Sequence, residues 1–143
     1  MVASDRVFLD SSYLIALEVE NDQHHDEAST HWTTLFEAPI NLVTTSYVVD
    51  EIVTFLNSRR QHAKAIRVGD NLLTASSVQL VHVDEDLFRD GWSYFKKHPD
   101  KTFSLTDCIS FVLMKRFEIS EALTFDRHFE QAGFTKLPPM NIP

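Results

Sequence analysis

The sequence predicts an α/β fold in which helices cover both faces of a central parallel sheet. Short runs of apolar and β-branched residues alternate along the chain with longer stretches of helical periodicity. Strands that alternate with helices usually pair in parallel, because each helix carries the chain back across the sheet. The length of 143 residues is that of one ordinary domain, so we expect a single domain over residues 1–143.

The predicted elements begin with a short buried strand over residues 7–9, followed by one or two helical turns over residues 12–17. Residues 24–36 have helical periodicity, and Asp22 is a candidate for the N-cap of this helix. Pro39 ends the helix, because proline lacks the amide hydrogen that a helix interior needs. The first third of the chain therefore predicts one strand and its crossover helices.

The middle of the chain continues the alternation of strands and helices. Residues 41–44 predict a second strand, and helices are expected over residues 47–57 and about 61–74. Residues 78–83 are rich in β-favouring side chains, which predicts a third strand. This strand ends at Asp84, which we expect to cap the next helix rather than to bind a metal.

The last third of the chain adds two longer helices and several short elements. In order these are a helix over 87–97, an apolar helix over 106–117, a strand over 122–125, a helix over 128–132 and a strand over 135–137. Trp32 and Trp92 both fall in helical apolar patterns, so we expect them in the core or in an interface.

Composition excludes several classes of protein. The hydrophobic content of 43%, with 11 phenylalanines, predicts a packed core rather than disorder. The net charge of −8 works against non-specific phosphate binding. Cys108 is the one cysteine, which rules out an intrachain disulfide and a cysteine-rich zinc site. No stretch reaches the ~20 apolar residues that span a bilayer, and no signal peptide is evident, so we expect a cytoplasmic protein without a membrane partner.

Two of the predicted strands are followed directly by an acid. Asp10 follows residues 7–9, and Asp126 follows residues 122–125. Ligands of open parallel sheets bind beyond the carboxyl ends of the strands, which is where both acids are expected. Each could instead simply cap the next helix, and a carboxylate with two oxygens can also do both.

Helical geometry separates two neighbouring acids in the predicted helix over residues 47–57. At roughly 100° per residue, Glu51 lies at the edge of the apolar arc, whereas Asp50 points well away from it. The arc consists of Val48, Val49, Ile52, Val53, Phe55 and Leu56. We therefore expect Asp50 to be solvated and Glu51 to reach into a cleft.

Asp107 lies on the same face of its predicted helix as Phe111 and Met114. An acid buried on that face without a partner costs several kcal/mol. Either Ser104 or Thr106 starts the helix and Asp107 favours its dipole, or Asp107 belongs to a polar cleft with other charges.

Together the four acids suggest a metal site. Gathering Asp10, Glu51, Asp107 and Asp126 at one sheet edge would raise their pKa values unless a cation intervenes. Oxygen-only, acid-rich sites suit Mg²⁺ or Mn²⁺, which orient and activate water for phosphodiester hydrolysis. No histidine pair at i, i+4 spacing joins them, because His24, His25 and His31 do not have it.

The segments FLDSSYLIAL, TTSYVVDEIVTFL, SLTDCISFVLMKRF and ALTFDRHFEQAGF occur in this order along the chain. In order and approximate spacing they resemble the PIN-domain ribonucleases, in particular the VapC-like toxins of type II toxin–antitoxin systems. The resemblance implies a three-layer α/β/α sandwich around a parallel sheet and a Mg²⁺- or Mn²⁺-dependent endoribonuclease. It also implies an RNA substrate, a cognate antitoxin and a homodimer.

The same resemblance assigns residues. It places the catalytic, metal-binding acids of the family at Asp10, Glu51, Asp107 and Asp126, with Ser11 as a supporting hydroxyl. Two alternatives within the family stay open: an RNA-processing nuclease that is not a toxin, and a catalytically idle binding module. A phospho-receiver domain fits less well, because it needs an acid pair after the first strand, and Asp10 is followed by two serines.

Overall fold

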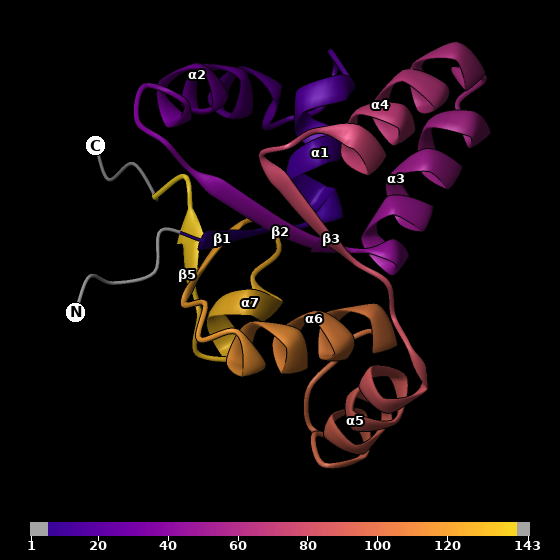
Figure 1. The fold of residues 1–143 in the computed structure, drawn as a ribbon, viewed down its shortest axis with the longest axis vertical. Coiled ribbons are helices and arrows are strands. Elements are labelled where there is room, and N and C mark those ends of the chain that lie inside the picture. Colours follow the sequence, from indigo (N-terminus) through magenta and orange to yellow (C-terminus); the bar gives the residue numbers. More distant parts are fainter. Residues whose placement is uncertain (1–5, 140–143) are drawn as a thin grey trace.

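A computed structural model describes residues 6–139 of the chain. Five strands form one sheet, all neighbours pair in parallel, and the strand order is β3-β2-β1-β4-β5 (Figure 1). The predicted parallel sheet is confirmed. The strands are β1 (Arg6–Leu9), β2 (Asn41–Thr45), β3 (Val78–Val81), β4 (Glu121–Leu123) and β5 (Thr135–Leu137).

Helices occupy every connection between the strands and form the two outer layers. Figure 1 shows α1 to α4 on one face of the sheet and α5 to α7 on the other. From β1 the chain adds β2 and β3 toward one edge of the sheet, and it then crosses to add β4 and β5 toward the other edge. Because crossover connections are right-handed, connections that run in opposite directions place their helices on opposite faces of the sheet. The helices are α1 (Ser11–Glu18), α2 (His25–Leu35), α3 (Ser46–Ser58), α4 (His62–Thr74), α5 (Glu85–Lys96), α6 (Leu105–Arg116) and α7 (His128–Gln131).

Two predicted strands end earlier than the sequence pattern suggests, because their last amides bond to side chains instead of a neighbouring strand. The Val83 N–H donates to Ser46 Oγ at 2.9 Å, and the Phe125 N–H donates to Ser12 Oγ at 2.9 Å. The chain therefore leaves the sheet at the edge where Asp126 lies.

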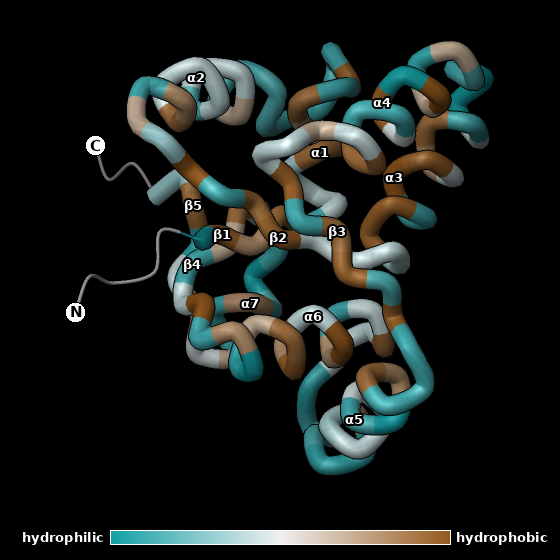
Figure 2. Tube along the Cα trace, in the orientation of Figure 1, coloured by the Kyte–Doolittle hydropathy of each residue, from teal (hydrophilic) through white to brown (hydrophobic). Residues whose placement is uncertain are grey.

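The apolar core fills both interfaces between the sheet and its helices, and the central strands β1 and β2 contribute buried apolar residues at 7–9 and 42–43. Figure 2 shows brown, hydrophobic stretches in both strands. Helix α6 is the most buried helix, since the sheet covers one side and α5 covers another. Its free thiol, Cys108, is buried in this core. Helix α5 approaches closely at Gly91, where an added Cβ would lie 2.4 Å from Ile109 Cγ1.

The structure tests the predicted helix caps Asp84 and Asp22 and the expected burial of Trp92. Asp84 caps α5, because its Oδ1 accepts the Leu87 N–H at 2.8 Å. Asp22 does not cap α2; its carboxylate accepts the His24 N–H within the preceding turn, and the helix begins without a side-chain cap. Trp92 is 45% exposed and stacks on Phe95, so it lies outside the core.

The strand order reverses at β1, which pairs with β2 on one side and β4 on the other. Asp10 follows β1, and its N–H donates to the Leu123 carbonyl of β4 at 3.0 Å. This is the point of an open parallel sheet where ligands bind. Within residues 6–139, no helix is long and apolar enough to cross a membrane.

Candidate active site

The structure brings the four acids singled out in the sequence to one edge of the sheet. Asp10 follows β1, Glu51 projects from α3, Asp107 lies in the first turn of α6 and Asp126 lies between β4 and α7. Their charges act on one another: Asp107 and Glu51 both raise the pKa of Asp10, and Asp107 and Asp126 raise that of Glu51. The predicted juxtaposition is therefore present.

Asp10 is the most deeply buried of the four acids, with 5% of its surface exposed. Its Oδ2 accepts hydrogen bonds from Ser12 Oγ at 2.6 Å, Thr124 Oγ1 at 2.8 Å and the Ser12 N–H at 3.3 Å. Burial raises the pKa of Asp10 to about 6, and the charges of Asp107 and Glu51 add to this, while the two hydroxyls oppose it. Asp10 thus caps α1 and belongs to the cluster at once.

Glu51 lies at the rim of the cluster, where α3 passes α1. Ser11 Oγ donates to Glu51 Oε1 at 2.8 Å, which fixes the carboxylate toward the other acids. Burial raises the pKa of Glu51, and the charge of Asp107 raises it further. Glu51 and Asp50 are both exposed, but Asp50 lies on the outer side of the helix, where it meets Thr54 instead of the other acids. The helix phase expected from the sequence is correct.

Asp107 fulfils both roles that the sequence left open. It forms a capping box with Ser104: its N–H donates to Ser104 Oγ at 3.0 Å, and its Oδ2 accepts the Ser104 N–H at 3.1 Å. Burial and the charge of Asp126 raise the pKa of Asp107, against the opposing effects of Ser104 and His128. Asp107 is thus the N3 residue of the capping box, with Ser104 as the N-cap, and it also faces the cluster.

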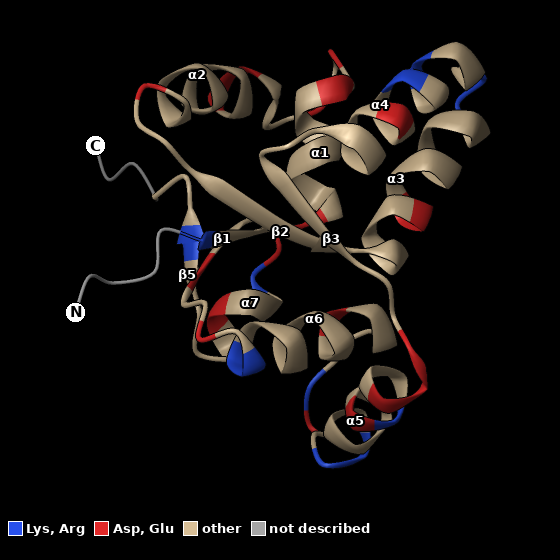
Figure 3. Ribbon diagram, in the orientation of Figure 1, with Lys and Arg blue, Asp and Glu red and all other residues tan. Residues whose placement is uncertain are grey.

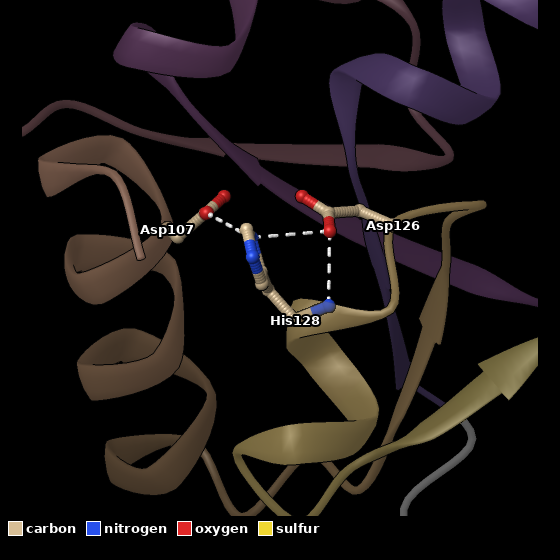
Figure 4. A group of neighbouring side chains, drawn as sticks. All are labelled: Asp107, Asp126 and His128. Atoms are coloured by element: carbon tan, nitrogen blue, oxygen red, sulfur yellow. Dashed lines mark hydrogen bonds and ion pairs between the residues drawn. The ribbon is translucent and has the colours of Figure 1, made fainter. Parts of the chain in front are cut away.

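Asp126 occupies the turn between β4 and α7. Its Oδ1 accepts the His128 N–H at 2.9 Å, and its own N–H donates to Thr124 Oγ1 at 3.0 Å. The His128 ring lies between the two aspartates, with Nδ1 3.2 Å from Asp126 Oδ1 and 3.3 Å from Asp107 Oδ2 (Figure 4). One potential ligand atom from each of these three side chains lies within 4.8 Å of the other two.

The four carboxylates share one pattern of hydrogen bonding. In each, one oxygen is held by the protein, whereas the other accepts no hydrogen bond from residues 6–139. Figure 4 shows this for Asp107 and Asp126, whose second oxygens point away from the imidazole. The held oxygens are Asp10 Oδ2, Glu51 Oε1, Asp107 Oδ2 and Asp126 Oδ1.

This pattern fits a bound divalent cation. Four neighbouring carboxylates repel one another, and burial raises the pKa of three of them, which is unfavourable at neutral pH without a counter-charge. The second oxygens leave an oxygen-only donor set, which hard divalent cations prefer. The chemistry of the donors therefore supports a metal centre.

Sequence reasoning identified the acids and Ser11 but missed three residues that hold them. Ser12 and Thr124 bond to Asp10, and His128 bridges two acids. A signal was available, because Ser12 and Thr124 each stand two positions from an acid, at Asp10 and Asp126. Hydroxyls at this spacing commonly bond to neighbouring backbone or side-chain groups.

A family model described as the PIN domain matches residues 7–135. The chain belongs to the PIN-domain family. It is 31% identical over 133 residues to the 23S rRNA-specific endonuclease VapC20 of Mycobacterium tuberculosis (strain CDC 1551 / Oshkosh), a match that covers 93% of this chain and 98% of the relative. The predicted family and its resemblance to VapC proteins are confirmed.

Solved structures give the same answer for the fold. The crystal structure of Mycobacterium tuberculosis VapC20, described as a Sarcin-Ricin loop cleaving toxin, superposes with a TM-score of 0.82 at 29% identity, covering 90% of this chain and 96% of that one. A toxin–antitoxin complex from Klebsiella pneumoniae matches with a TM-score of 0.63 at 14% identity, covering 95% and 99%. The predicted α/β/α fold of this chain is confirmed.

Proposed function

We propose that this chain is a Mg²⁺- or Mn²⁺-dependent endoribonuclease, and that it acts as the toxin of a toxin–antitoxin pair. The observation that carries the proposal is the carboxylate cluster, in which each of four acids has one held oxygen and one oxygen that accepts no hydrogen bond from the described residues. The relationship to VapC20, a named endonuclease, supports the same activity.

The four acids hold the cation in this proposal, and the side chains around them hold the acids. Asp10, Glu51, Asp107 and Asp126 offer their second oxygens, and their negative charges supply the attraction. Orientation of these ligands comes from neighbouring hydroxyls, amides and one imidazole, as is usual for the partners of metal ligands. The residues that orient them are Ser11, Ser12, Ser104, Thr124 and His128.

The reaction is hydrolysis of a phosphodiester bond. A divalent ion held by Asp10, Glu51, Asp107 and Asp126 would supply Lewis-acid chemistry, which would make a water a competent nucleophile. The water oxygen forms a bond to phosphorus, the bond from phosphorus to the 3′ oxygen breaks, and that oxygen takes a proton. The products carry a 5′-phosphate and a 3′-hydroxyl, so the 2′-hydroxyl of the RNA takes no part.

The alternative route, attack by the 2′-hydroxyl, requires a base at the cluster. His128 is the histidine closest to the acids in the geometry described above, but both of its ring nitrogens are engaged. Nδ1 faces Asp107 and Asp126, and Nε2 lies 3.0 Å from Thr102 Oγ1. The arrangement therefore supports water rather than the 2′-hydroxyl as the nucleophile.

The first substrate to test is the sarcin–ricin loop of 23S rRNA, because VapC20 is named for 23S rRNA and its crystal structure for that loop. The net charge is −8, so binding of RNA depends on local cations. Figure 3 shows lysines and arginines around the connection between α5 and α6. This connection contains Lys101, which directly precedes Thr102 at the site. A ribosomal substrate would place the enzyme in the cytoplasm.

A cleavage assay tests the activity. An RNA oligonucleotide with the sarcin–ricin sequence should be cut in Mg²⁺ or Mn²⁺ and left intact in a chelator, and Asp126→Asn should cut more slowly. Mass spectrometry should find 5′-phosphate and 3′-hydroxyl ends, and a single 2′-deoxy substitution at the cut position should be tolerated. Cyclic phosphate ends, or cleavage in the chelator, would contradict the proposal.

A groove between α1, α2 and α4 supports an antitoxin partner. It encloses about 480 Å³ and is lined by apolar side chains that include Leu14, Leu17, Trp32 and Leu72. Phe36 at its edge is 43% exposed. An amphipathic helix of a small antitoxin can bury its apolar face in such a groove. The test uses the product of a small neighbouring gene as the candidate antitoxin, and Phe36→Asp should weaken its binding to this chain. If that product does not bind the wild-type chain, the RNA-processing alternative is favoured.

Exposed apolar side chains on α4 support a homodimer. Ile66 is 51% exposed and Leu73 is 58% exposed, and both line a surface depression between α3 and α4. Contiguous exposed apolar residues often mark interaction sites between proteins. Light scattering should give the mass of a dimer for the wild type and of a monomer for Leu73→Asp.

A further inference from the structure

His128 lies inside the cluster but is not an acid. Its ring is 18% exposed, and Nδ1 is 3.3 Å from Asp107 Oδ2 and 3.2 Å from Asp126 Oδ1 (Figure 4). On its other side Nε2 is 3.0 Å from Thr102 Oγ1. The edge of the ring also packs against Phe103, with 5.5 Å between centroids and an interplanar angle of 79°. The imidazole is thus fixed by polar contacts at two atoms and by one aromatic contact.

These contacts decide which ring nitrogen carries hydrogen. A lone pair on Nδ1 would face two carboxylate oxygens at hydrogen-bond distance, which is repulsive, so Nδ1 carries the hydrogen. Nε2 can then accept the hydroxyl hydrogen of Thr102. A protonated Nδ1 has no lone pair for a metal, and Nε2 is directed at Thr102. The imidazole is therefore a donor to the acids.

We propose that His128 is a positioning residue that sets the separation of the Asp107 and Asp126 carboxylates, because its Nδ1–H donates to Asp107 and lies at ion-pair distance from Asp126. The imidazole contacts Asp107 Oδ2 by a hydrogen bond and Asp126 Oδ1 at 3.2 Å, which leaves the opposite oxygen of each acid for the cation. The inference rests on the proposed function, since it assigns how two of the proposed ligands are held.

Loss of the ring should spare the fold, because each acid keeps another donor. Asp107 Oδ2 still accepts the Ser104 N–H, and Asp126 Oδ1 still accepts the His128 backbone N–H. What disappears is the one contact that joins the two carboxylates directly. The expected defect is therefore in metal affinity, with little change in the stability of the metal-free protein.

Two substitutions separate the two nitrogens of the ring. In His128→Asn the side-chain amide nitrogen takes the place of Nδ1, and in His128→Gln it takes the place of Nε2. Titration calorimetry with Mn²⁺ alone, without RNA, should show His128→Asn within about threefold of the wild type. His128→Gln should bind about 10- to 100-fold more weakly, the usual loss when a partner of a metal ligand is removed. Thermal unfolding in a chelator should give similar midpoints for all three proteins.

A further variant leaves the imidazole in place. Thr102→Val removes the partner of Nε2, so the ring loses one of its two polar anchors and Mn²⁺ affinity should fall by less than in His128→Gln. Pulsed electron paramagnetic resonance of the wild-type Mn²⁺ complex should show no directly bonded imidazole nitrogen. Such a nitrogen signal would make His128 a ligand and overturn its positioning role.

The outcomes also separate this inference from the proposed function. If the wild type binds Mn²⁺ and both His128 variants bind it equally well, or lose it equally, the positioning role is wrong and the metal site stands. If the wild type does not bind Mn²⁺ or Mg²⁺, the proposed function fails and the inference fails with it.

Discussion

The two sides of the carboxylate cluster are held by different chemistry. The side next to α1 and α3 supplies Asp10 and Glu51, whose held oxygens accept hydrogen bonds mainly from hydroxyl groups of Ser11, Ser12 and Thr124. The side next to α6 and α7 supplies Asp107 and Asp126. Their held oxygens accept hydrogen bonds from backbone amides and from one imidazole.

Packing differs between the same two sides. On the second side α5 presses on α6, and an added Cβ at Gly91 would lie 3.2 Å from the Cα of Ile109. On the first side α4 lies against α3 at Gly69, where the nearest atom to an added Cβ is Val53 Cγ2 at 3.4 Å. Ligand positions on the first side therefore depend on side chains that can rotate. On the second side they depend on backbone that a neighbouring helix fixes.

The largest effect should come from Glu51, the acid of the first side that is held by a single hydroxyl. Glu51→Gln keeps the bond to Ser11 through its amide oxygen but removes a charge from the cluster. We expect kcat/KM for RNA cleavage in Mn²⁺ to fall more than about 100-fold, beyond the 10- to 100-fold typical of losing a partner of a metal ligand. Asp50→Asn, one residue away on the exposed face, should stay within about twofold. Equal losses in both variants would contradict the helix phase.

A second effect concerns Asp10 in the metal-free protein. Its pKa is raised from 3.8 to about 6, so between these pH values the folded state keeps a proton that the unfolded state releases. Stability therefore falls as pH rises through this window, and the full penalty is about 3 kcal/mol above pH 6. Asp10→Asn removes the charge, and its amide oxygen can keep the hydrogen bonds of Ser12 and Thr124.

Urea unfolding in a chelator at a series of pH values measures this effect. The free energy of unfolding of Asp10→Asn should be close to that of the wild type below pH 4 and greater by about 3 kcal/mol above pH 6. Added Mn²⁺ should stabilise the wild type much more than the variant. A difference that does not change with pH would show that the carboxylate of Asp10 is not destabilising in the folded state.

The smallest effects compare the packing of the two sides directly. Gly91→Ala places a methyl group against Ile109, so we expect a loss of about 1–2 kcal/mol in the free energy of unfolding. Gly69→Ala adds a methyl group at ordinary contact distance inside α4, so we expect a gain of about 0.5–1 kcal/mol from helix propensity. Thermal and urea unfolding of both variants test the contrast, and the same sign for both would contradict it.

The sequence predicted the strands, the parallel sheet and the four acids, because each of these follows from a local pattern. Apolar runs between helical segments give the strands, and acids directly after two strands fall at the ligand-binding edge of a parallel sheet. The border position of Glu51 follows from helical angles. The sequence could not decide between the two roles of Asp107, because a residue in the first turn of α6 can both complete the capping box and face the other acids.

The supporting groups depend on contacts that sequence spacing does not specify. Thr124 meets Asp10 across 114 positions of the chain, and Thr102 meets His128 across 26. Such pairs follow from the register of β1 with β4 and from the path of the connection before α6. Trp92 lies outside the core, since α5 contacts the core through Leu87 and Gly91 and leaves an aromatic face exposed; its place in an interface stays a prediction.

The place of β4 in the sheet has a consequence for the order in which the enzyme is made. This strand inserts between β1 and β5 and is followed by the last of the four acids, so the cluster closes only after a late segment docks beside the earliest strand. Pairing over such a long sequence separation is slow compared with local helix formation. A chain still emerging from the ribosome, before residue 126 has left it, therefore lacks the complete cluster of four carboxylates.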